Sequence, residues 1–598
     1  MTKTTTKVDK ARSAPAPSWF QGWKDYLLSL YNGLLGKDTV HAAQLQEFPY
    51  IGHMPDMLRK DGLGMDKIIK KANKVAKKHP SGRCKFTING TRVLLITDPN
   101  DIQFILENYK NDLVNNGEPV TWELLFRGTN VFSSSTDSEF WKNIRHQFLS
   151  NLHTEQALQR NEKCIQENIQ HYLKRIEKEG HVIPFSHFCL FLTFDIIAET
   201  QFGIKNLKNE DALKLKLADN ISKMMDLLAP HWIQRVAKFS EFLPSRFRSW
   251  FKDAISPEFT RLRKESYALL REKIIKPNLE NIDKSEGSWW HFAQKNGMSE
   301  EEAIENLFAQ VLVPGFHTTS GALLAITHAL ANVELWSKSD LRFELQVEIE
   351  DYAKKIGRPP ERWTNQDFKE LPLFTAFFME ALRLYSPVQL IAYPVKNYIP
   401  YAGGCYPGDM IFICPGITHK NERIYQDSLK LNLERPLFKD KSFSDMVDKI
   451  CYAFFPFGFP PRLCPGKRFA GNEIMQFVAS MLYHYSVNTD YAIDPVDDTS
   501  SVIFLMRYSE AALNSHLFLM PRVEVASEAM QLNHPSESGR RDSISSLASE
   551  EHTDENEKLW QALAEDINKT LVFTAQSPTA EEDPSTNLQN TLALKYKG

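Results

Sequence analysis

One cysteine in this chain lies where its sulfur could bind a metal. Cys464 ends a loop rich in Pro, Gly and Phe, and an apolar helical pattern follows it to about Tyr485. A cysteine just before a helix start is close to free backbone N–H groups and to the positive end of the helix dipole, and both lower the pKa of a thiol. A thiolate held by such donors beside Arg462 is suited to ligating iron. A lone cysteine is more often a small buried apolar residue, so residue type alone leaves both interpretations open.

A second unusual stretch interrupts a long apolar helical pattern. Ser299 and Glu302 fit a capping box at its start. Pro314, in its middle, removes one helical N–H and clashes with the carbonyl four residues back, which predicts a local break. Gly315 and nearby hydroxyls such as Thr318 can satisfy the freed backbone groups.

The loop that ends in the cysteine resembles the haem-binding loop of the cytochrome P-450 superfamily, which reads Phe-x-x-Gly-x-Arg-x-Cys-x-Gly. Phe457, Arg462, Cys464 and Gly466 match this pattern, and Pro460 stands where the family has glycine. Proline is held at negative φ, whereas glycine can adopt positive φ in a tight turn. We therefore expect the loop to depart from the family backbone at this point.

Two more motifs follow the family's order. Trp141 and Arg145 share a helix face, an ordinary aromatic–cation pair by spacing alone, and the resemblance implies that they donate to the haem propionates. Gly315 and Thr318 match the groove of the family's central helix, where dioxygen binds and protons arrive. His317 replaces the family's acid; it can relay protons as well, or only hydrogen-bond within the helix.

Glu380 and Arg383 form the last of the matching motifs. A pair three residues apart on a helix is usually an exposed pair of little energetic weight. In the family this pair is buried and locked to a second arginine from a downstream loop, and Arg435 stands at the matching place. A buried trio of this kind is costly to break.

The resemblance implies a mainly α fold with a small β region. This is the cytochrome P-450 fold, with haem b (iron protoporphyrin IX) bound between the long central helix and the helix after the cysteine loop, and Cys464 as its axial ligand. The catalytic domain is expected over residues 46–523. Independently of the family, the segment 85–99 is predicted to be a hairpin around Asn89 and Gly90.

The two ends of the chain differ in composition from its body. Residues 1–45 are expected to be a polar leader that contains a short amphipathic aromatic segment, 19–35. This segment is too short and too charged for a membrane span, which needs ~20 apolar residues; it either packs on the domain or lies in a membrane interface. Residues 524–598 are acidic and Ser-rich, and we predict that they are disordered.

Composition bounds the class of protein. Of the 598 residues 42% are hydrophobic and 24% charged, which is typical of a globular protein with a large core. The seven scattered cysteines include no Cys-x-x-Cys pair, which disfavours a disulfide framework or zinc site and favours a reducing compartment. From Glu524 onward, 14 acidic and 6 basic residues give a net charge of −8. Since the whole chain has a net charge of −4, the residues before Glu524 carry about +4, which is too little to indicate nucleic-acid binding. No secretory signal is evident, so an intracellular location is expected, cytoplasmic or peripherally membrane-associated.

The resemblance implies a monooxygenase that inserts one oxygen atom of O2 into an apolar organic substrate, with lipids, fatty acids and sterol-like molecules as candidates. The Cys464 thiolate would favour O–O cleavage, and Thr318, helped by His317 or water, would deliver protons. A separate flavoprotein reductase or ferredoxin would supply electrons at a basic proximal face, expected around Lys142, Arg462, Lys467 and Arg468. Two alternatives remain open: a peroxide-driven oxygenase or hydroperoxide isomerase or dehydratase on the same fold, and a non-catalytic haem carrier or sensor.

Overall fold

The computed structural model describes residues 42–44, 64–88, 91–113, 131, 134–204, 207–228, 254, 256–278, 289–332, 341–496, 499–502 and 505–522. The chain divides into two units, Met1–Pro521 and Arg522–Gly598, and every described helix and strand belongs to the first. The aromatic segment 19–35, the turn residues Asn89 and Gly90, and the tail 524–598 lie outside the described residues. None of the helices in the described part is long and apolar enough to cross a lipid bilayer.

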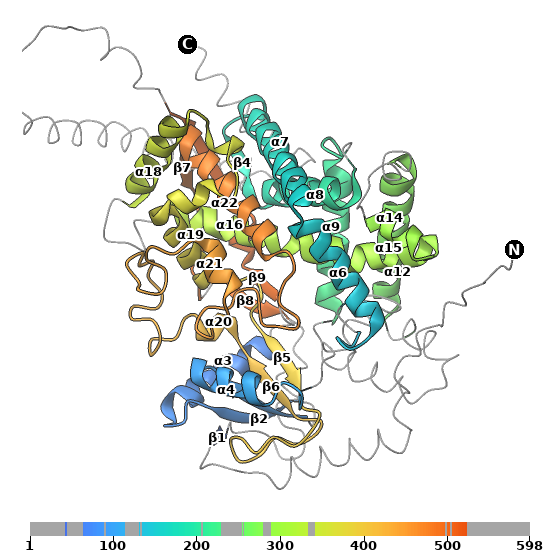
Figure 1. Ribbon diagram of the computed structural model, residues 1–598, viewed down its shortest axis with the longest axis vertical. Helices are drawn as coiled ribbons and strands as arrows, with labels where there is room; N and C mark the ends of the chain where they lie inside the picture. Colours follow the sequence, from blue (N-terminus) through green and yellow to red (C-terminus); the bar gives the residue numbers. More distant parts are fainter. Residues whose placement is uncertain are drawn as a thin grey trace, which may run out of the picture. The chain divides into compact units, whose positions relative to one another are not determined.

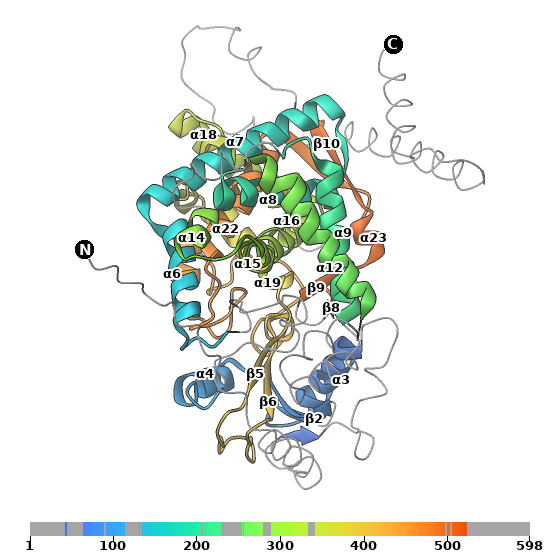
Figure 2. The same ribbon diagram turned by 90° about the vertical axis from the view of Figure 1, so that its right-hand side faces the viewer.

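A five-stranded sheet forms the main β region (Figure 1). Its order is β1 (Ala43–Gln44), β2 (Cys84–Ile88), β3 (Thr91–Ile96), β6 (Met410–Ile413) and β5 (Ile391–Pro394). Strands β2 and β3 are antiparallel with Phe86 opposite Val93, which confirms the predicted hairpin. The β3–β6 pair is parallel and the β5–β6 pair antiparallel. Helices α3 (Gly64–Lys78) and α4 (Pro99–Asn108) lie beside this sheet in both ribbon views (Figures 1 and 2).

The rest of the described fold is mostly helical, and the expectation of a mainly α fold is confirmed. The longer helices are α6 (Glu139–His153), α7 (Glu155–Glu179), α8 (Phe185–Phe202), α9 (Asp211–Leu228), α12 (Pro257–Leu269), α15 (Glu300–Leu307), α16 (Thr318–Ala331), α18 (Leu341–Ile356), α19 (Pro372–Leu384) and α22 (Lys467–His484). The shorter ones are α14 (Trp289–Lys295), α20 (Pro415–Thr418), α21 (Phe443–Asp448) and α23 (Glu510–Leu513), with η2 (Leu270–Ile275), η3 (Phe308–His317), η4 (Pro360–Arg362) and η5 (Asp367–Glu370). Strands β4 (Val182–Pro184), β10 (His516–Pro521) and β7 (Tyr485–Thr489) form a second sheet, and β8 (Thr499–Val502) pairs with β9 (Leu505–Tyr508).

Helix α16 lies in the core. Every residue from Thr319 to Ala331 except Gly321 is buried, and a helix that is apolar on all sides must be enclosed by other elements. Helices α8, α19 and α22 pack against it, as Figure 2 shows. Because α22 begins directly after the Cys464 loop, this packing fixes the loop relative to the central helix.

The central helix is built from α15, η3 and α16 in direct succession. Its start has the predicted capping box: the Ser299 hydroxyl accepts from the Glu302 N–H at 3.2 Å, and Glu302 accepts from the Ser299 N–H at 2.9 Å. The predicted break at Pro314 takes the form of a π-helical segment, η3, rather than an interruption. The Thr318 hydroxyl donates to the Pro314 carbonyl at 2.7 Å, so a side chain satisfies the backbone there as expected.

Candidate functional site

The Cys464 loop is shaped by backbone hydrogen bonds. The N–H of Gly458 donates to the Phe455 carbonyl at 3.1 Å, and the N–H of Cys464 donates to the Phe457 carbonyl at 3.0 Å. The left-handed position of this turn is Gly458, with φ +76°, which a residue with a side chain rarely adopts. The loop thus makes its tight turn before Pro460 and does not need positive φ there.

The sulfur of Cys464 accepts a hydrogen bond from the N–H of Gly466, which caps α22. Burial raises the pKa of the Cys464 thiol, while the Gly466 N–H, Arg145 and Lys467 act to lower it. The expectation of a lowered thiol pKa is therefore wrong for the protein alone, because desolvation outweighs the helix start and the two cations. A bound metal cation deprotonates a coordinating thiol outright, so this environment still suits a metal–thiolate bond.

Three donor side chains from two distant segments meet beside this loop. The guanidinium groups of Arg145 and Arg462 lie 5.3 and 5.9 Å from the centroid of the Trp141 ring. Burial lowers the pKa of both arginines, that of Arg462 to about 10. Two desolvated guanidinium groups over one indole form a donor set that fits a pair of carboxylates such as the haem propionates.

These arginines also hold the loop in place. Arg145 Nη2 donates to the Leu463 carbonyl at 2.8 Å, across 318 residues of sequence. Arg462 donates to the carbonyls of Val131, at 2.9 Å, and Ser134, at 2.5 Å. The same side chains that could bind an anionic group therefore join α6 and the segment before it to the Cys464 loop.

The residues predicted on the central helix lie at the junction of η3 and α16. A Cβ built on Gly315 would come within 2.7 Å of Ile197 Cγ1, so α8 packs directly against the backbone at this point. Burial lowers the pKa of His317, which keeps its ring neutral near pH 7. Thr318 donates its only proton to the Pro314 carbonyl, and its oxygen remains able to accept a hydrogen bond.

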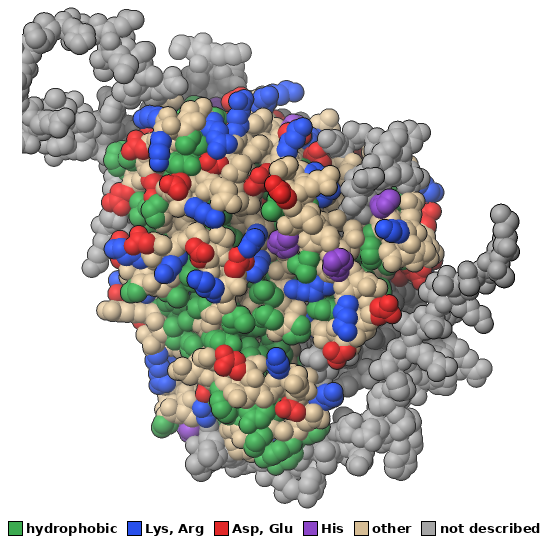
Figure 3. Space-filling model, in the orientation of Figure 1, with side chains coloured by type: hydrophobic (Ala, Val, Ile, Leu, Met, Phe, Trp, Pro, Cys, Tyr) green, Lys and Arg blue, Asp and Glu red, His purple; other side chains and the backbone are tan. Residues whose placement is uncertain are grey.

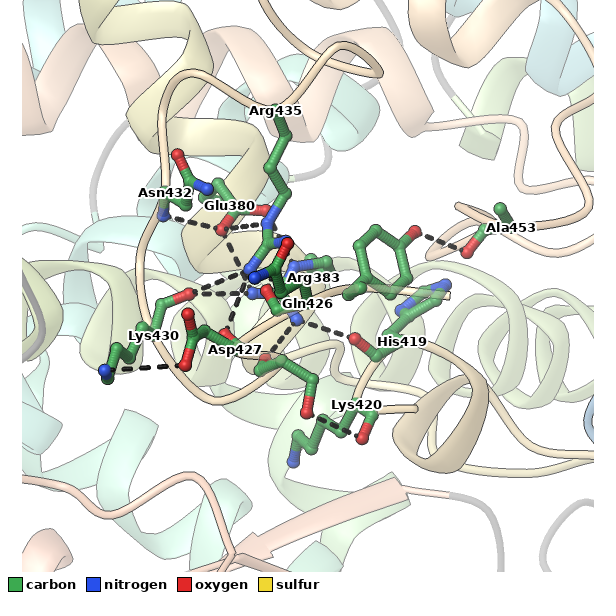
Figure 4. A network of polar contacts seen from close by, with 12 residues as sticks. Glu380, Arg383, His419, Lys420, Gln426, Asp427, Lys430, Asn432, Arg435 and Ala453 are labelled. Carbon is green, nitrogen blue, oxygen red and sulfur yellow. Dashed lines mark hydrogen bonds and ion pairs between the residues drawn. The ribbon is translucent and has the colours of Figure 1, made fainter. Parts of the chain in front are cut away.

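Glu380, Arg383 and Arg435 form the predicted buried trio. Figure 4 shows the carboxylate of Glu380 between the two guanidinium groups. Arg383 donates to it from Nε at 2.7 Å and Nη2 at 3.0 Å, Arg435 from Nε at 3.0 Å, and the backbone N–H of Asn432 at 2.9 Å. Glu380 and Arg383 are fully buried, so the pair is not the exposed one that its spacing alone would suggest.

His419 connects this trio to the Cys464 loop, a role that the sequence did not indicate. Arg383 Nη1 donates to the His419 carbonyl at 2.6 Å, and the His419 ring accepts from the Phe455 N–H at 3.0 Å (Figure 4 labels Arg383 and His419). Burial, with Arg383 and Lys420, lowers the pKa of His419 to about 3, so the ring is neutral and its Nε2 is free to accept. The sequence signal for this residue is a resemblance: His419 to Glu422 falls where the P450 family has a similar histidine-containing turn.

Glu473, on the helix after the cysteine loop, is a second residue whose setting the sequence alone did not indicate. Its side chain is 1% exposed, burial raises its pKa well above the ordinary value, and Oε1 has no hydrogen-bond partner in the described part of the chain. A carboxyl in this setting is neutral. The available sequence signal was a lone acidic residue among the mainly apolar residues from Phe469 to Leu482.

The surface beside the Cys464 loop combines the predicted basic residues with an apolar groove. Asp448 pairs with Lys467 at 3.1 Å and also with Arg468, and Arg462 points inward. A groove of about 200 Å³ opens here; it is lined by Met446, Val447, Asp448, Lys449, Ile450, Cys451, Phe454, Phe455, Pro456, Phe457, Gly458, Phe459, Pro460 and Leu463. Figure 3 shows hydrophobic side chains gathered over this region of the face. The groove beside the predicted basic face is therefore mainly apolar, and the single Asp448 offsets only part of the charge of Lys467 and Arg468, while Lys142 is exposed.

Comparison with known proteins agrees with this geometry. The family model described as cytochrome P450 matches residues 44–514. "Probable cytochrome P450 4aa1" of Drosophila melanogaster is 33% identical over 188 residues, 31% of this chain and 34% of that protein. "Cytochrome P450 52A12" of Debaryomyces hansenii is 24% identical over 420 residues, 66% and 76% of the two chains. "Bifunctional cytochrome P450/NADPH--P450 reductase" of Aspergillus oryzae is 29% identical over 205 residues, 32% of this chain and 17% of that protein.

Proposed function

Because the chain belongs to the cytochrome P450 family and so to the haem–thiolate monooxygenases, we propose that Cys464 is the axial ligand of the haem. We also propose that the substrate of the enzyme is an apolar organic molecule. The observation that supports this most is the sulfur's own setting. Cys464 accepts from the Gly466 N–H and lies near Arg145 of α6, beside two half-buried guanidinium groups over Trp141. When bound, the haem supplies the iron that activates O2.

The residues on the cysteine side hold and orient the cofactor. Trp141, Arg145 and Arg462 would bind the propionates, with the two arginines providing charge and the indole ring a rigid platform. Phe457 and Gly466 shape the loop around the sulfur through the 3.0 Å bond of Phe457 to the Cys464 N–H and the N–H donor of Gly466. This arrangement fixes the thiolate before substrate arrives.

The residues on the central helix would move protons. Gly315 brings the backbone against α8, and the Thr318 hydroxyl is oriented by the Pro314 carbonyl so that its oxygen can accept from water. His317 is neutral, and a neutral imidazole can accept a proton on one nitrogen and give one from the other. Pro314, Gly315 and Thr318 support the proposal of a proton relay at this point of the central helix.

The electrons would come from a separate flavoprotein reductase or ferredoxin. The relative from Aspergillus oryzae, which is named as a bifunctional cytochrome P450/NADPH–P450 reductase, supports this kind of donor. The groove beside the loop includes Phe457 and Leu463, the latter directly before Cys464 in the sequence, and is where such a donor would contact the chain. Because Asp448 offsets part of the charge of Lys467 and Arg468 and most of the groove lining is apolar, we expect apolar contacts to contribute to this complex beside charge.

A peroxide-driven reaction is the second candidate, favoured by one observation. His317 stands in place of the acid that would complete proton delivery from water, and peroxide already carries the protons and electrons that this route needs. The test is turnover of fatty-acid and sterol panels with NADPH and a P450 reductase, beside hydrogen peroxide alone. The monooxygenase proposal expects product only with NADPH and reductase; product with peroxide alone, at equal or higher yield, would overturn it.

Location and membrane contact are also proposals. We place the enzyme inside the cell, in the cytoplasm or at a membrane surface reached through the segment 19–35, which lies outside the described residues. The aromatic residues of that segment would lie in the interface and its charges in water. Removing residues 1–35 and measuring co-sedimentation with lipid vesicles tests the contact; lipid binding that does not change would contradict it.

A further inference from the structure

His153, the last residue of α6, makes a direct contact with the loop on the far side of Cys464. Its Nε2 lies 2.9 Å from the Pro465 carbonyl oxygen. A carbonyl oxygen can only accept, so Nε2 carries the proton and the ring donates. His153 is eight residues after Arg145, about two helical turns, so both side chains leave the same face of α6.

Helix α6 therefore holds the loop on both sides of the cysteine. Arg145 donates to the carbonyl of Leu463, one residue before Cys464, and His153 donates to that of Pro465, one residue after it. The two contacts span more than 310 residues of sequence. No other described helix has hydrogen bonds to both neighbours of the cysteine.

The contact at Pro465 reaches the sulfur through a single peptide group. The carbonyl of Pro465 and the N–H of Gly466 belong to the same amide, and that N–H donates to the Cys464 sulfur. A hydrogen bond accepted by an amide oxygen polarises the amide and makes its N–H a stronger donor. His153, the peptide and the sulfur thus form a chain of two hydrogen bonds that strengthen each other.

The charges around His153 leave its ring neutral. Burial lowers its pKa, Arg468 and Lys467 lower it further, and Asp448 acts in the opposite direction. A neutral donor suffices for the argument, because polarisation of the amide needs only the N–H of the ring. The effect therefore does not depend on protonation of His153.

We propose that His153 is a positioning residue that sets how much electron density the Cys464 thiolate gives to the iron, acting through the Pro465–Gly466 peptide. The inference rests on the proposed role of Cys464 as ligand. A strong N–H donor withdraws density from the thiolate and favours the ferrous state, since hydrogen bonds to ligating sulfur set the reduction potential. Without His153 the Gly466 N–H is a weaker donor, and the potential moves to more negative values.

The test is the ferric/ferrous reduction potential of the haem-loaded protein with His153→Phe, which keeps a ring of similar size without a donor. We expect the ferrous state to be disfavoured about threefold, which is ~28 mV at 59 mV per tenfold change for one electron. His153→Gln retains an N–H donor and is expected to restore most of the shift. His146→Phe, at an exposed histidine of the same helix, is the matched control and is expected to leave the potential unchanged.

The outcomes separate the inference from the assignment on which it rests. A wild-type protein whose reduced carbon monoxide complex lacks the red-shifted Soret band of thiolate ligation would overturn the role of Cys464. With that band present, an unchanged potential in His153→Phe, or an equal shift in the Phe and Gln variants, would overturn the inference and leave His153 a packing residue. If His153→Phe does not bind haem, His153→Lys replaces it: a charged donor at this position is predicted to raise the potential above wild type, with His146→Lys as control.

Discussion

The carboxylate of Glu380 offers the sharpest test of how the fold is held together. It accepts four hydrogen bonds, three from Arg383 and Arg435 and one from the Asn432 N–H, and it is fully buried. Glu380→Gln keeps its shape but removes the charge that balances two buried guanidinium groups. Loss of one member of a buried ion pair costs about 3–5 kcal/mol, because an uncompensated charge is left in the interior. That is a large part of the ~5–15 kcal/mol that separates folded from unfolded protein.

The assay is equilibrium unfolding in urea, followed by helical circular dichroism and by the Soret band in the haem-loaded protein. The matched control is Glu434→Gln, which removes an exposed partner of Lys439 in the same loop region; an exposed pair of this kind is expected to leave the unfolding midpoint unchanged. Glu380→Gln is expected to unfold at a clearly lower urea concentration and to lose haem in the same transition, since His419 ties the trio to the Phe455 N–H. An unfolding midpoint equal to that of wild type would refute this reasoning.

Three further predictions follow from single contacts. His419 has a folded pKa of about 3, below its ordinary value of ~6.5, so the unfolded chain takes up the proton first as pH falls, and between pH 7 and 5 this residue alone should remove about 2 kcal/mol of stability. Urea midpoints measured at the two pH values should show a smaller loss of stability in His419→Gln than in wild type, and an equal loss would count against the buried neutral ring. Gly315→Ala should destabilise the folded protein by about 1–3 kcal/mol because its Cβ would meet Ile197. A thermal scan should show that part of the lost stability is recovered in the double variant with Ile197→Ala, whereas a Gly315→Ala protein as stable as wild type would mean that α8 is not in contact there. Thr318→Val should leave the haem spectrum unchanged but reduce the product formed per NADPH consumed, measured by product yield against NADPH oxidation, whereas full coupling in this variant would remove Thr318 from proton delivery.

Local patterns in the sequence predicted the parts of the structure that depend on neighbours along the chain. The capping box at Ser299 and Glu302 and the hairpin of β2 and β3 need only a few adjacent residues, and both are present. The trio of Glu380, Arg383 and Arg435 was predicted through resemblance to a family, since spacing alone suggests an exposed pair.

Features that depend on tertiary packing were not predictable in this way. The thiol pKa of Cys464 follows from how the surrounding tertiary structure desolvates the sulfur, which no spacing reveals. The pairing of Lys467 and Arg468 depends on one shared carboxylate, Asp448, about 20 residues away on a separate helix. The bond from His153 to the Pro465 carbonyl links segments 312 residues apart through a backbone atom, and backbone acceptors leave no trace in the sequence.

The measurement that tests the central claim most directly is the absorption spectrum of the purified protein, reduced and exposed to carbon monoxide, beside Cys464→Ser. The claim that Cys464 ligates the haem iron as a thiolate predicts a strongly red-shifted Soret band in the wild type and its loss in the variant. A wild-type band at the position of an ordinary histidine-ligated haem, or a red-shifted band that persists in Cys464→Ser, would contradict it.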